Sequence, residues 1–271
     1  MMYHEVFEND KNIIGMVHLL PLPGHAYHTN MQAVTDAALY DAEALLKGGV
    51  THAIIENDGD RPFGISNLRY DFGRTHTSMA DVGRVVHVRF PELNLGVQVL
   101  NNYSQTPGIL NAIGGTFLRS QFYCEARIDP DERIIMPNCV ELCRSNEGCD
   151  FVILADINSK GSRPLESEYD PEESVKRIVD SEFMPDGLIT TGAQTGVAPS
   201  REQVSEFMLI VHRHDPGMPI GVGSGVTPKA ITDGLLDNAG FAVVGSCFKT
   251  DGKVDSEKVE KLMLTLEETY S

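Results

Sequence analysis

Short apolar runs alternate along this chain with longer amphipathic segments. Most of the runs are nearly continuous in apolar residues rather than alternating with polar ones, which is typical of parallel strands buried on both faces. The runs lie at residues 13–19, 52–57, 95–100, 116–121, 151–157, 187–192, 220–225 and 241–248. We therefore expect eight buried strands, the first starting at about residue 13.

The segments between the runs carry helical signals. In residues 31–49 the apolar side chains repeat at helical spacing, and the segment ends at a glycine pair that suits a helix C-cap. Residues 169–182 contain Asp170 as a cap followed by a proline at the first helical position. Residues 200–214 and 256–270 have the same amphipathic pattern.

The order of strand then helix repeats about eight times over roughly 250 residues, which matches the (β/α)8 or TIM barrel. A doubly wound open sheet is the alternative. No linker rich in Pro, Gly or Ser and no low-complexity block interrupts the chain. We expect residues 1–271 to form a single TIM-barrel domain, with the last helix running to about residue 270.

The charge balance limits the partners that we expect. The chain has 22 Lys and Arg against 39 Asp and Glu, a formal net charge of -17. A field of this sign repels nucleic acid and anionic membranes, and no apolar run approaches the roughly 20 residues that span a bilayer. Five cysteines without an export signal favour a reducing cytoplasm. We expect a cytoplasmic protein, and leave open whether it is a homo-oligomer.

The stretch GVGSGVTP at residues 221–228 holds the densest group of glycines in the chain. Its pattern indicates a strand, a tight turn and a helix start, where unpaired N–H groups favour an anion. Barrels often bind a phosphate at the ends of the seventh and eighth strands. The predicted phosphate-binding residues are Gly192, Gly223, Ser224, Gly225, Gly245 and Ser246. The alternative is that these glycines only permit close packing of helix on strand.

The first five predicted strands end in ionisable or amide side chains. A carboxylate after a buried run can have a raised pKa that suits proton transfer, and both Asp156 and Glu56 follow such runs. We predict that these two act as general base and general acid. The other predicted catalytic residues, which would orient or polarise a substrate, are His18, Lys160 and Arg119.

Other roles for these residues stay open. Asp156 could instead form a structural ion pair, for which the candidate partners are Lys160, Arg119 and Arg163. His18 could be a ligand, a base or a core histidine with satisfied hydrogen bonds. His18, Glu56 and Asp156 together could hold a divalent metal at the barrel mouth, although their spacing does not require one. The sequence indicates no other cofactor.

Two long polar segments follow predicted strands, at residues 58–77 and 158–169. In a barrel both would lie on the face that carries the active site, and long loops without structure are usually lids or binding loops. The predicted lid or substrate-loop residues are Asn57, Asp58, Asp60 and Arg61.

Several stretches from the first strand to beyond the eighth form a wider pattern. They are IGMVHLLPLPG (14–24), DAEALLKGGV (41–50), IIENDGDRPF (54–63), ILAD (153–156) with PL at 164–165, TGAQTG (191–196), VGSGVTP (222–228) and VVGSCFKTDGK (243–253). Together they resemble the BtpA family, and HLLPLPG and ENDGD are its specific motifs. The resemblance implies a TIM barrel of the ribulose-phosphate-binding group. The family takes its name from a role in photosystem I biogenesis.

Three functions are compatible with this sequence. The first, which we favour, is an enzyme that acts on a small phosphorylated metabolite, such as a sugar phosphate or nucleotide-derived compound, as an isomerase or lyase using carboxylate acid/base chemistry. The second is a non-catalytic assembly or regulatory factor of the BtpA type, for which we expect a large apolar surface patch. The third is a ligand-sensing protein that keeps the phosphate site.

Overall fold

Eight parallel strands close into a barrel in the computed structural model, which describes residues 3–7, 11–61, 72–100, 106–129, 132–146, 150–165, 170–194 and 196–271. The strands, in barrel order, are β1 (Asn12–His18), β11 (Phe241–Val244), β10 (Ile220–Val222), β9 (Gly187–Thr190), β7 (Val152–Asp156), β4 (Phe117–Ser120), β3 (Asn94–Gln98) and β2 (His52–Glu56). The TIM barrel is confirmed, and each strand coincides with one of the predicted runs. A closed barrel excludes the open doubly wound sheet.

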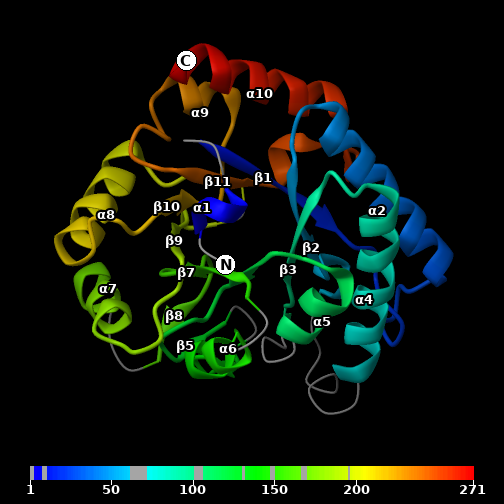
Figure 1. Ribbon diagram of the computed structural model, residues 1–271, viewed down its shortest axis with the longest axis horizontal. Coiled ribbons are helices and arrows are strands. Elements are labelled where there is room, and N and C mark those ends of the chain that lie inside the picture. Colours follow the sequence, from blue (N-terminus) through cyan, green and yellow to red (C-terminus); the bar gives the residue numbers. More distant parts are fainter. Residues whose placement is uncertain are drawn as a thin grey trace.

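Helices surround the ring of strands (Figure 1). They are α2 (Met31–Lys47), α4 (Phe72–Arg89), α5 (Thr106–Ile113), α6 (Cys139–Asn146), α7 (Pro171–Val179), α8 (Arg201–His214), α9 (Pro228–Thr232) and α10 (Ser256–Tyr270). Asp170 caps α7 as predicted, accepting a hydrogen bond from the Glu172 backbone N–H at 2.9 Å. Ser200 and Gln203 form a capping box at the start of α8.

The N-terminal end of the barrel is closed by the short helix α1 (Tyr3–Val6) and by Phe7. In Figure 1, α1 lies over the middle of the ring of strands. The Phe7 ring centroid is 5.2 Å from that of Phe117, and His52 Nε2 is 2.8 Å from the Val6 carbonyl oxygen. Phe117 and His52 are the first residues of β4 and β2. The α1–Phe7 segment, which we call the N-terminal plug, therefore covers the N-terminal ends of the strands.

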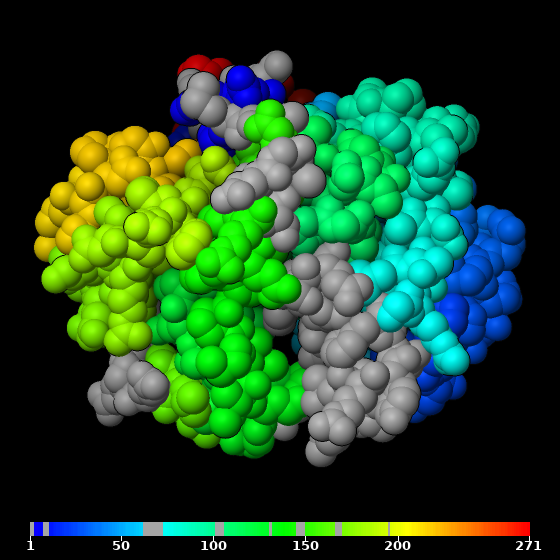
Figure 2. All heavy atoms as spheres, turned by 60° about the horizontal axis from the view of Figure 1, so that its bottom comes forward, coloured from blue at the N-terminus to red at the C-terminus, as the bar shows by residue number. Residues whose placement is uncertain are grey.

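Additional structure covers parts of the C-terminal face. The strands β5 (Arg127–Ile128), β6 (Ile134–Ile135) and β8 (Arg163–Pro164) form a small antiparallel sheet that joins the segments after β4 and β7. The strands β12 (Lys249–Thr250) and β13 (Lys253–Val254) pair after β11. In Figure 2 the green segments that include α5 and α6 lie between α2 and α4 on one side and α7 and α8 on the other.

The two predicted loops are partly structured. The first begins with a 3-10 helix, η1 (Asp58–Asp60), and α4 already starts at Phe72, so the predicted loop end at residue 77 is wrong. The polar first turns of α4 hid the helix, because the buried Met79 and Val82 that give it an apolar face come later. Residues 62–71 and 166–169 lie outside the described residues. Part of the second loop forms β8.

Within the described ranges, no helix is long and apolar enough to cross a membrane.

Gly221 lies inside the barrel at a position where the structure leaves no room for a side chain. A substitution there tests how the barrel interior is packed. A Cβ atom at this position would lie 2.2 Å from Cε2 of the buried Phe241 ring. We predict that Gly221→Ala destabilises the protein by about 1–3 kcal/mol through overpacking. At roughly 2–4 °C per kcal/mol, the melting temperature should fall by several degrees.

The matched control is Gly108→Ala on the exposed side of α5, where a Cβ meets no atom within 4 Å. Alanine there should stabilise the helix by about 0.5–1 kcal/mol. Differential scanning calorimetry of both variants measures the effect, and equal melting temperatures would contradict this packing of the barrel interior.

Candidate functional site

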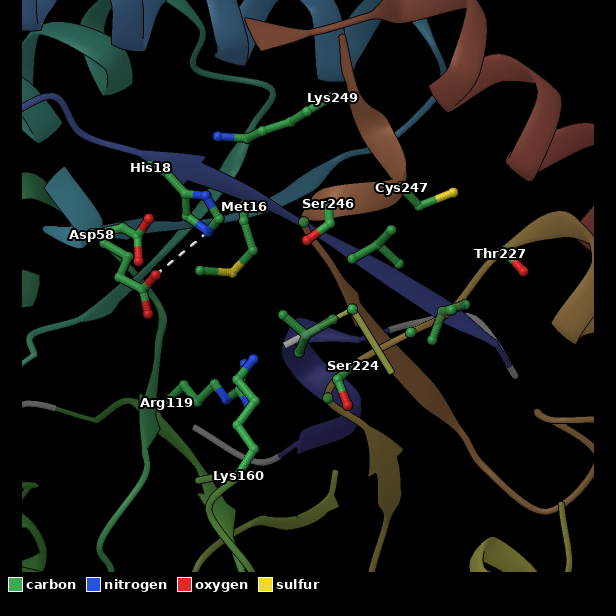
Figure 3. A pocket seen from close by; sticks show the side chains of 18 of the residues that line it. Met16, His18, Asp58, Arg119, Lys160, Ser224, Thr227, Ser246, Cys247 and Lys249 are labelled. Carbon is green, nitrogen blue, oxygen red and sulfur yellow. Dashed lines mark ion pairs between the residues drawn. The ribbon is translucent and has the colours of Figure 1, made fainter. Parts of the chain in front are cut away.

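A cavity of about 490 Å³ opens at the C-terminal ends of the strands. Figure 3 shows that its side chains come from opposite sides, with His18 and Met16 of β1 between Lys249 above and the Arg119–Lys160 pair below. The predicted site residues that line it are His18, Glu56, Asp58, Arg61, Arg119, Lys160, Gly223, Ser224, Gly225, Gly245 and Ser246. The cavity thus brings both halves of the predicted site together, because parallel strands place their carboxyl ends at one face.

Four predicted site residues do not line the cavity: Asp156, Gly192, Asn57 and Asp60. They lie behind the lining residues and hold them, as described below. Lining residues that were not among the predicted site residues are Met16, Gln121, Gly196, Val226, Thr227, Val243, Val244, Cys247 and Lys249.

Arg119 and Asp156 form a buried ion pair between the neighbouring strands β4 and β7. Arg119 Nε and Nη2 each donate to one carboxylate oxygen of Asp156 at 2.8 Å. Burial by itself would lower the pKa of Arg119, but the charge and hydrogen bonds of Asp156 outweigh it and raise that pKa. This is the structural pairing considered for Asp156. Both carboxylate oxygens of Asp156 are bonded to Arg119. The role of Asp156 as general base stays a prediction.

His18 and Glu56 form the second pair of the cavity, across the neighbouring strands β1 and β2. His18 Nε2 lies 3.4 Å from Glu56 Oε2. Burial, helped by the nearby Asp58 carboxylate, raises the pKa of Glu56 to about 7. Burial and the positive charge of Lys249 lower the pKa of His18 to about 4. Near neutral pH the pair therefore holds a neutral imidazole beside a carboxyl group at its titration midpoint.

The two lysines of the cavity are partly desolvated. Burial lowers the pKa of Lys160, and the positive charge of Arg119 lowers it further. Burial also lowers the pKa of Lys249, whose Nζ lies 3.9 Å from Asp41 Oδ2. Lys249, the first residue of β12, was expected to cap the barrel mouth and was not among the predicted site residues.

The glycine-rich ends of β9 and β10 pack closely on each other. The Ser224 hydroxyl accepts a hydrogen bond from the Gly192 backbone N–H at 2.9 Å and donates one to the Val197 carbonyl at 2.8 Å. Gly225 has φ +69°, and a Cβ there would lie 2.0 Å from the Ala198 backbone nitrogen. For these positions the geometry matches the close-packing alternative. Their role in phosphate binding stays a prediction.

Gly223 and Gly245 have different neighbours, which belong to the cavity itself. A Cβ at position 223 would lie 2.7 Å from Arg119 Nη2, and one at position 245 would lie 3.3 Å from His18 Cε1. Glycine at these positions leaves room for the two functional side chains. Any larger residue at 223 would have to displace the guanidinium and the side chains of Ile189 and Thr191.

The two motifs HLLPLPG and ENDGD contact each other at the rim. Asp60 accepts a hydrogen bond from the Leu22 backbone N–H at 2.8 Å, and Asn57 donates to Asp60 at 2.9 Å. A Cβ at Gly59 would lie 2.5 Å from the Leu19 carbonyl oxygen. Asn57 and Asp60 thus brace the turn that carries Asp58 and Arg61, whose side chains pair at 2.9 Å.

Gln98 is a further candidate site residue, and it was not predicted from the sequence. It is the register partner of Glu56 on β3 and is fully buried. Neither its amide nitrogen nor its amide oxygen has a hydrogen-bond partner among the described residues. Its position on the same face as Glu56 could have been inferred from strand alternation, but it stands inside an apolar run.

The divalent metal considered for His18, Glu56 and Asp156 finds no preformed set of ligands. In the part of the chain that the structure describes, no group of three or more His, Cys, Asp and Glu side chains is arranged to hold a metal ion. Asp156 is bound to Arg119 instead.

Known proteins match nearly the whole chain. The model of the BtpA family matches residues 9–268. A protein of Archaeoglobus fulgidus is 31% identical over 257 residues, which are 94% of this chain and 98% of that protein. The photosystem I biogenesis protein BtpA of Synechocystis sp. is 29% identical over 255 residues, covering 93% of this chain and 85% of its own length.

Solved structures with little sequence similarity share the fold. Thiamine phosphate pyrophosphorylase of Pyrococcus furiosus superimposes with a TM-score of 0.58 at 12% identity, over 97% of this chain and 98% of that one. That likeness concerns the barrel alone, whereas the family match extends over the strands, the rim motifs and the glycine-rich turns. The chain belongs to the BtpA family.

Proposed function

We propose that this protein binds a small phosphorylated metabolite in the barrel-mouth cavity and acts on it as an isomerase or lyase. The observation that carries the proposal is the convergence of four cationic side chains on one cavity in a chain of formal net charge -17. They are Arg61, Arg119, Lys160 and Lys249. Because the overall field repels anions, a local cluster of cations favours an anionic ligand there. The cavity volume suits a small molecule.

The His18–Glu56 pair would supply the proton transfers. A general acid or base works best when its pKa lies near the working pH, and the pKa of Glu56 is about 7. The neutral imidazole of His18 would orient Glu56 by accepting a hydrogen bond from its protonated form, since His18 Nε2 lies 3.4 Å from Glu56 Oε2. Arg119, held by Asp156, would orient an oxyanion with the nitrogen that the ion pair leaves unused, Nη1.

The name of the structural neighbour gives this proposal modest support. The Pyrococcus furiosus barrel is named for a phosphorylated compound, thiamine phosphate. The Synechocystis relative, named for photosystem I biogenesis, favours the second candidate, a non-catalytic assembly factor. An assembly factor has no need of a carboxyl group that titrates near neutrality inside a cationic cavity, so we favour the enzyme.

Phosphorylated ligands should stabilise the protein against heat. We expect inorganic phosphate and ribose 5-phosphate to raise the melting temperature, and unphosphorylated ribose to leave it unchanged. A ligand at about a hundred times its Kd adds roughly 2.7 kcal/mol, or several degrees for a chain of this size. Thermal-shift titration at fixed salt, with and without a divalent cation, measures this effect.

Lys249→Met should weaken ribose 5-phosphate binding by about ten- to a hundredfold, since a charge-assisted hydrogen bond contributes about 1.5–3 kcal/mol. Lys229→Met is the matched control, because Lys229 is exposed and pairs with Asp233 on α9. Equal losses in both variants, or no thermal shift in the wild type, would count against the proposed site.

The acid/base pair also predicts a pH dependence of stability. The pKa of Glu56 rises from 4.5 to about 7 on folding, so its contribution to the unfolding free energy falls as the pH rises through that range. The pKa of His18 falls from 6.5 to about 4, so its contribution falls as the pH drops below 6.5. Between pH 4.5 and 6.5 the two slopes oppose each other, and the pair adds little net pH dependence to the wild type.

Single variants should separate the two slopes. Relative to the wild type, His18→Gln should lose stability as the pH rises from 4 to 6.5, and Glu56→Gln should gain stability as the pH rises from 4.5 to 7. Urea unfolding at several pH values measures both slopes, and the double variant, which lacks both groups, is the control. Slopes that change in the same direction in both single variants would refute the proposed protonation states.

A further inference from the structure

We propose that Lys160 is a nucleophile that forms an imine with the carbonyl carbon of a phosphorylated aldehyde or ketone held in the cavity. This inference rests on the proposed function and names the substrate class of the same site. It would make the ligand a phosphorylated carbonyl compound rather than any small phosphate.

The position of Lys160 among the cations of the cavity singles it out. Arg119 pairs with Asp156, Arg61 with Asp58, and Lys249 lies 3.9 Å from Asp41. The Lys160 amine has no carboxylate within 4.0 Å and no hydrogen bond among the described residues, although it lines the cavity. The Lys160 amine is therefore available to a ligand in the cavity.

Figure 3 shows the amine of Lys160 beside the Arg119 side chain, which lies across the barrel from Lys249. Lys160 follows β7 by four residues. It is held over the end of the barrel by a short loop, in which the Ser162 hydroxyl donates to the Ser159 carbonyl at 2.7 Å. The loop is thus held by its own hydrogen bond, and the amine that it carries is open to a ligand.

Burial and two neighbouring arginines favour the neutral form of this amine. Burial and the positive charge of Arg119 lower the pKa of Lys160, and Arg61 adds to this. Glu56 and Asp156 act in the opposite direction but do not reverse it. An amine attacks a carbonyl group only when neutral, and desolvation beside another cation is a known way to activate lysine. At a pH well below the pKa, each unit by which the pKa of the amine falls raises the fraction of neutral amine about tenfold.

The reaction balances with groups of the cavity. The Nζ lone pair forms a bond to the carbonyl carbon and the C=O π bond breaks, and a proton then moves from the nitrogen to the oxygen to give a carbinolamine. Glu56, whose pKa is about 7, donates a proton to the departing hydroxyl, which leaves as water. The nitrogen lone pair forms the C=N bond of a protonated imine, which returns one proton to the Glu56 carboxylate, so that amine and carbonyl give imine and one water. The imine withdraws electrons from the neighbouring carbon, as an isomerase or lyase requires.

Reductive trapping tests this inference on the full-length protein. The probe is D-glyceraldehyde 3-phosphate with sodium cyanoborohydride, and intact mass followed by peptide mapping locates the adduct. We expect one adduct at Lys160, formed about tenfold faster than with unphosphorylated D-glyceraldehyde, a difference of about 1.4 kcal/mol. Inorganic phosphate should slow the labelling. The rate should reach half its maximum at a pH below the ordinary lysine pKa of about 10.4.

Two charge-conserving variants make the test specific. Lys160→Arg should abolish the adduct, and Lys229→Arg, at an exposed position outside the cavity, should keep it. The thermal unfolding of both variants controls for folding.

The outcomes separate this inference from the proposed function. Absence of an adduct at Lys160, with a thermal shift by ribose 5-phosphate intact, overturns the imine and leaves phosphate binding standing. Labelling of Lys160 at equal rates with both aldehydes, unaffected by inorganic phosphate, overturns the phosphorylated substrate class. Labelling spread over surface lysines, with no preference for Lys160, refutes the activated amine.

Discussion

The buried ion pair between Arg119 and Asp156 is the interaction on which the rest of the site depends. It bridges β4 and β7 with two hydrogen bonds of 2.8 Å. Removal of one partner would leave an uncompensated buried charge, at a cost of about 3–5 kcal/mol. The same guanidinium fills the space that a side chain at position 223 would occupy, and it lowers the pKa of Lys160. The pair thus contacts a glycine of the rim, places the Arg119 cation in the cavity and, together with burial, sets the lowered pKa of Lys160.

Other parts of the fold cover the N-terminal end of the barrel and form the walls of the cavity at the C-terminal end. The N-terminal plug buries aromatic rings against the first residues of the strands, and the cavity opens at the opposite face. At that face the two rim motifs interlock through Asp60 and Leu22, which fixes the turn after Glu56. The closure of β1 against β11 brings Lys249 close enough to lower the pKa of His18. The electrostatics of the cavity therefore follow from the fold rather than from local sequence.

The sequence predicts the strands and their order well, because a buried parallel strand needs a nearly continuous apolar run. It also places His18, Glu56 and Arg119 at one face, since residues at strand ends meet there. It could not show that Asp156 turns to Arg119, or that the Ser224 hydroxyl bonds within the protein. Such choices depend on side chains that lie more than 25 residues apart in sequence, at distances that only the closed barrel sets.

A crystal structure with ribose 5-phosphate would show whether the cavity binds a phosphorylated metabolite, as we propose. We expect density for the phosphate inside the cavity, within hydrogen-bond distance of at least one of Arg119, Lys160 and Lys249, with the sugar directed toward Glu56. An empty cavity in crystals soaked at saturating ligand, or density only on the outer surface of the barrel, would contradict it.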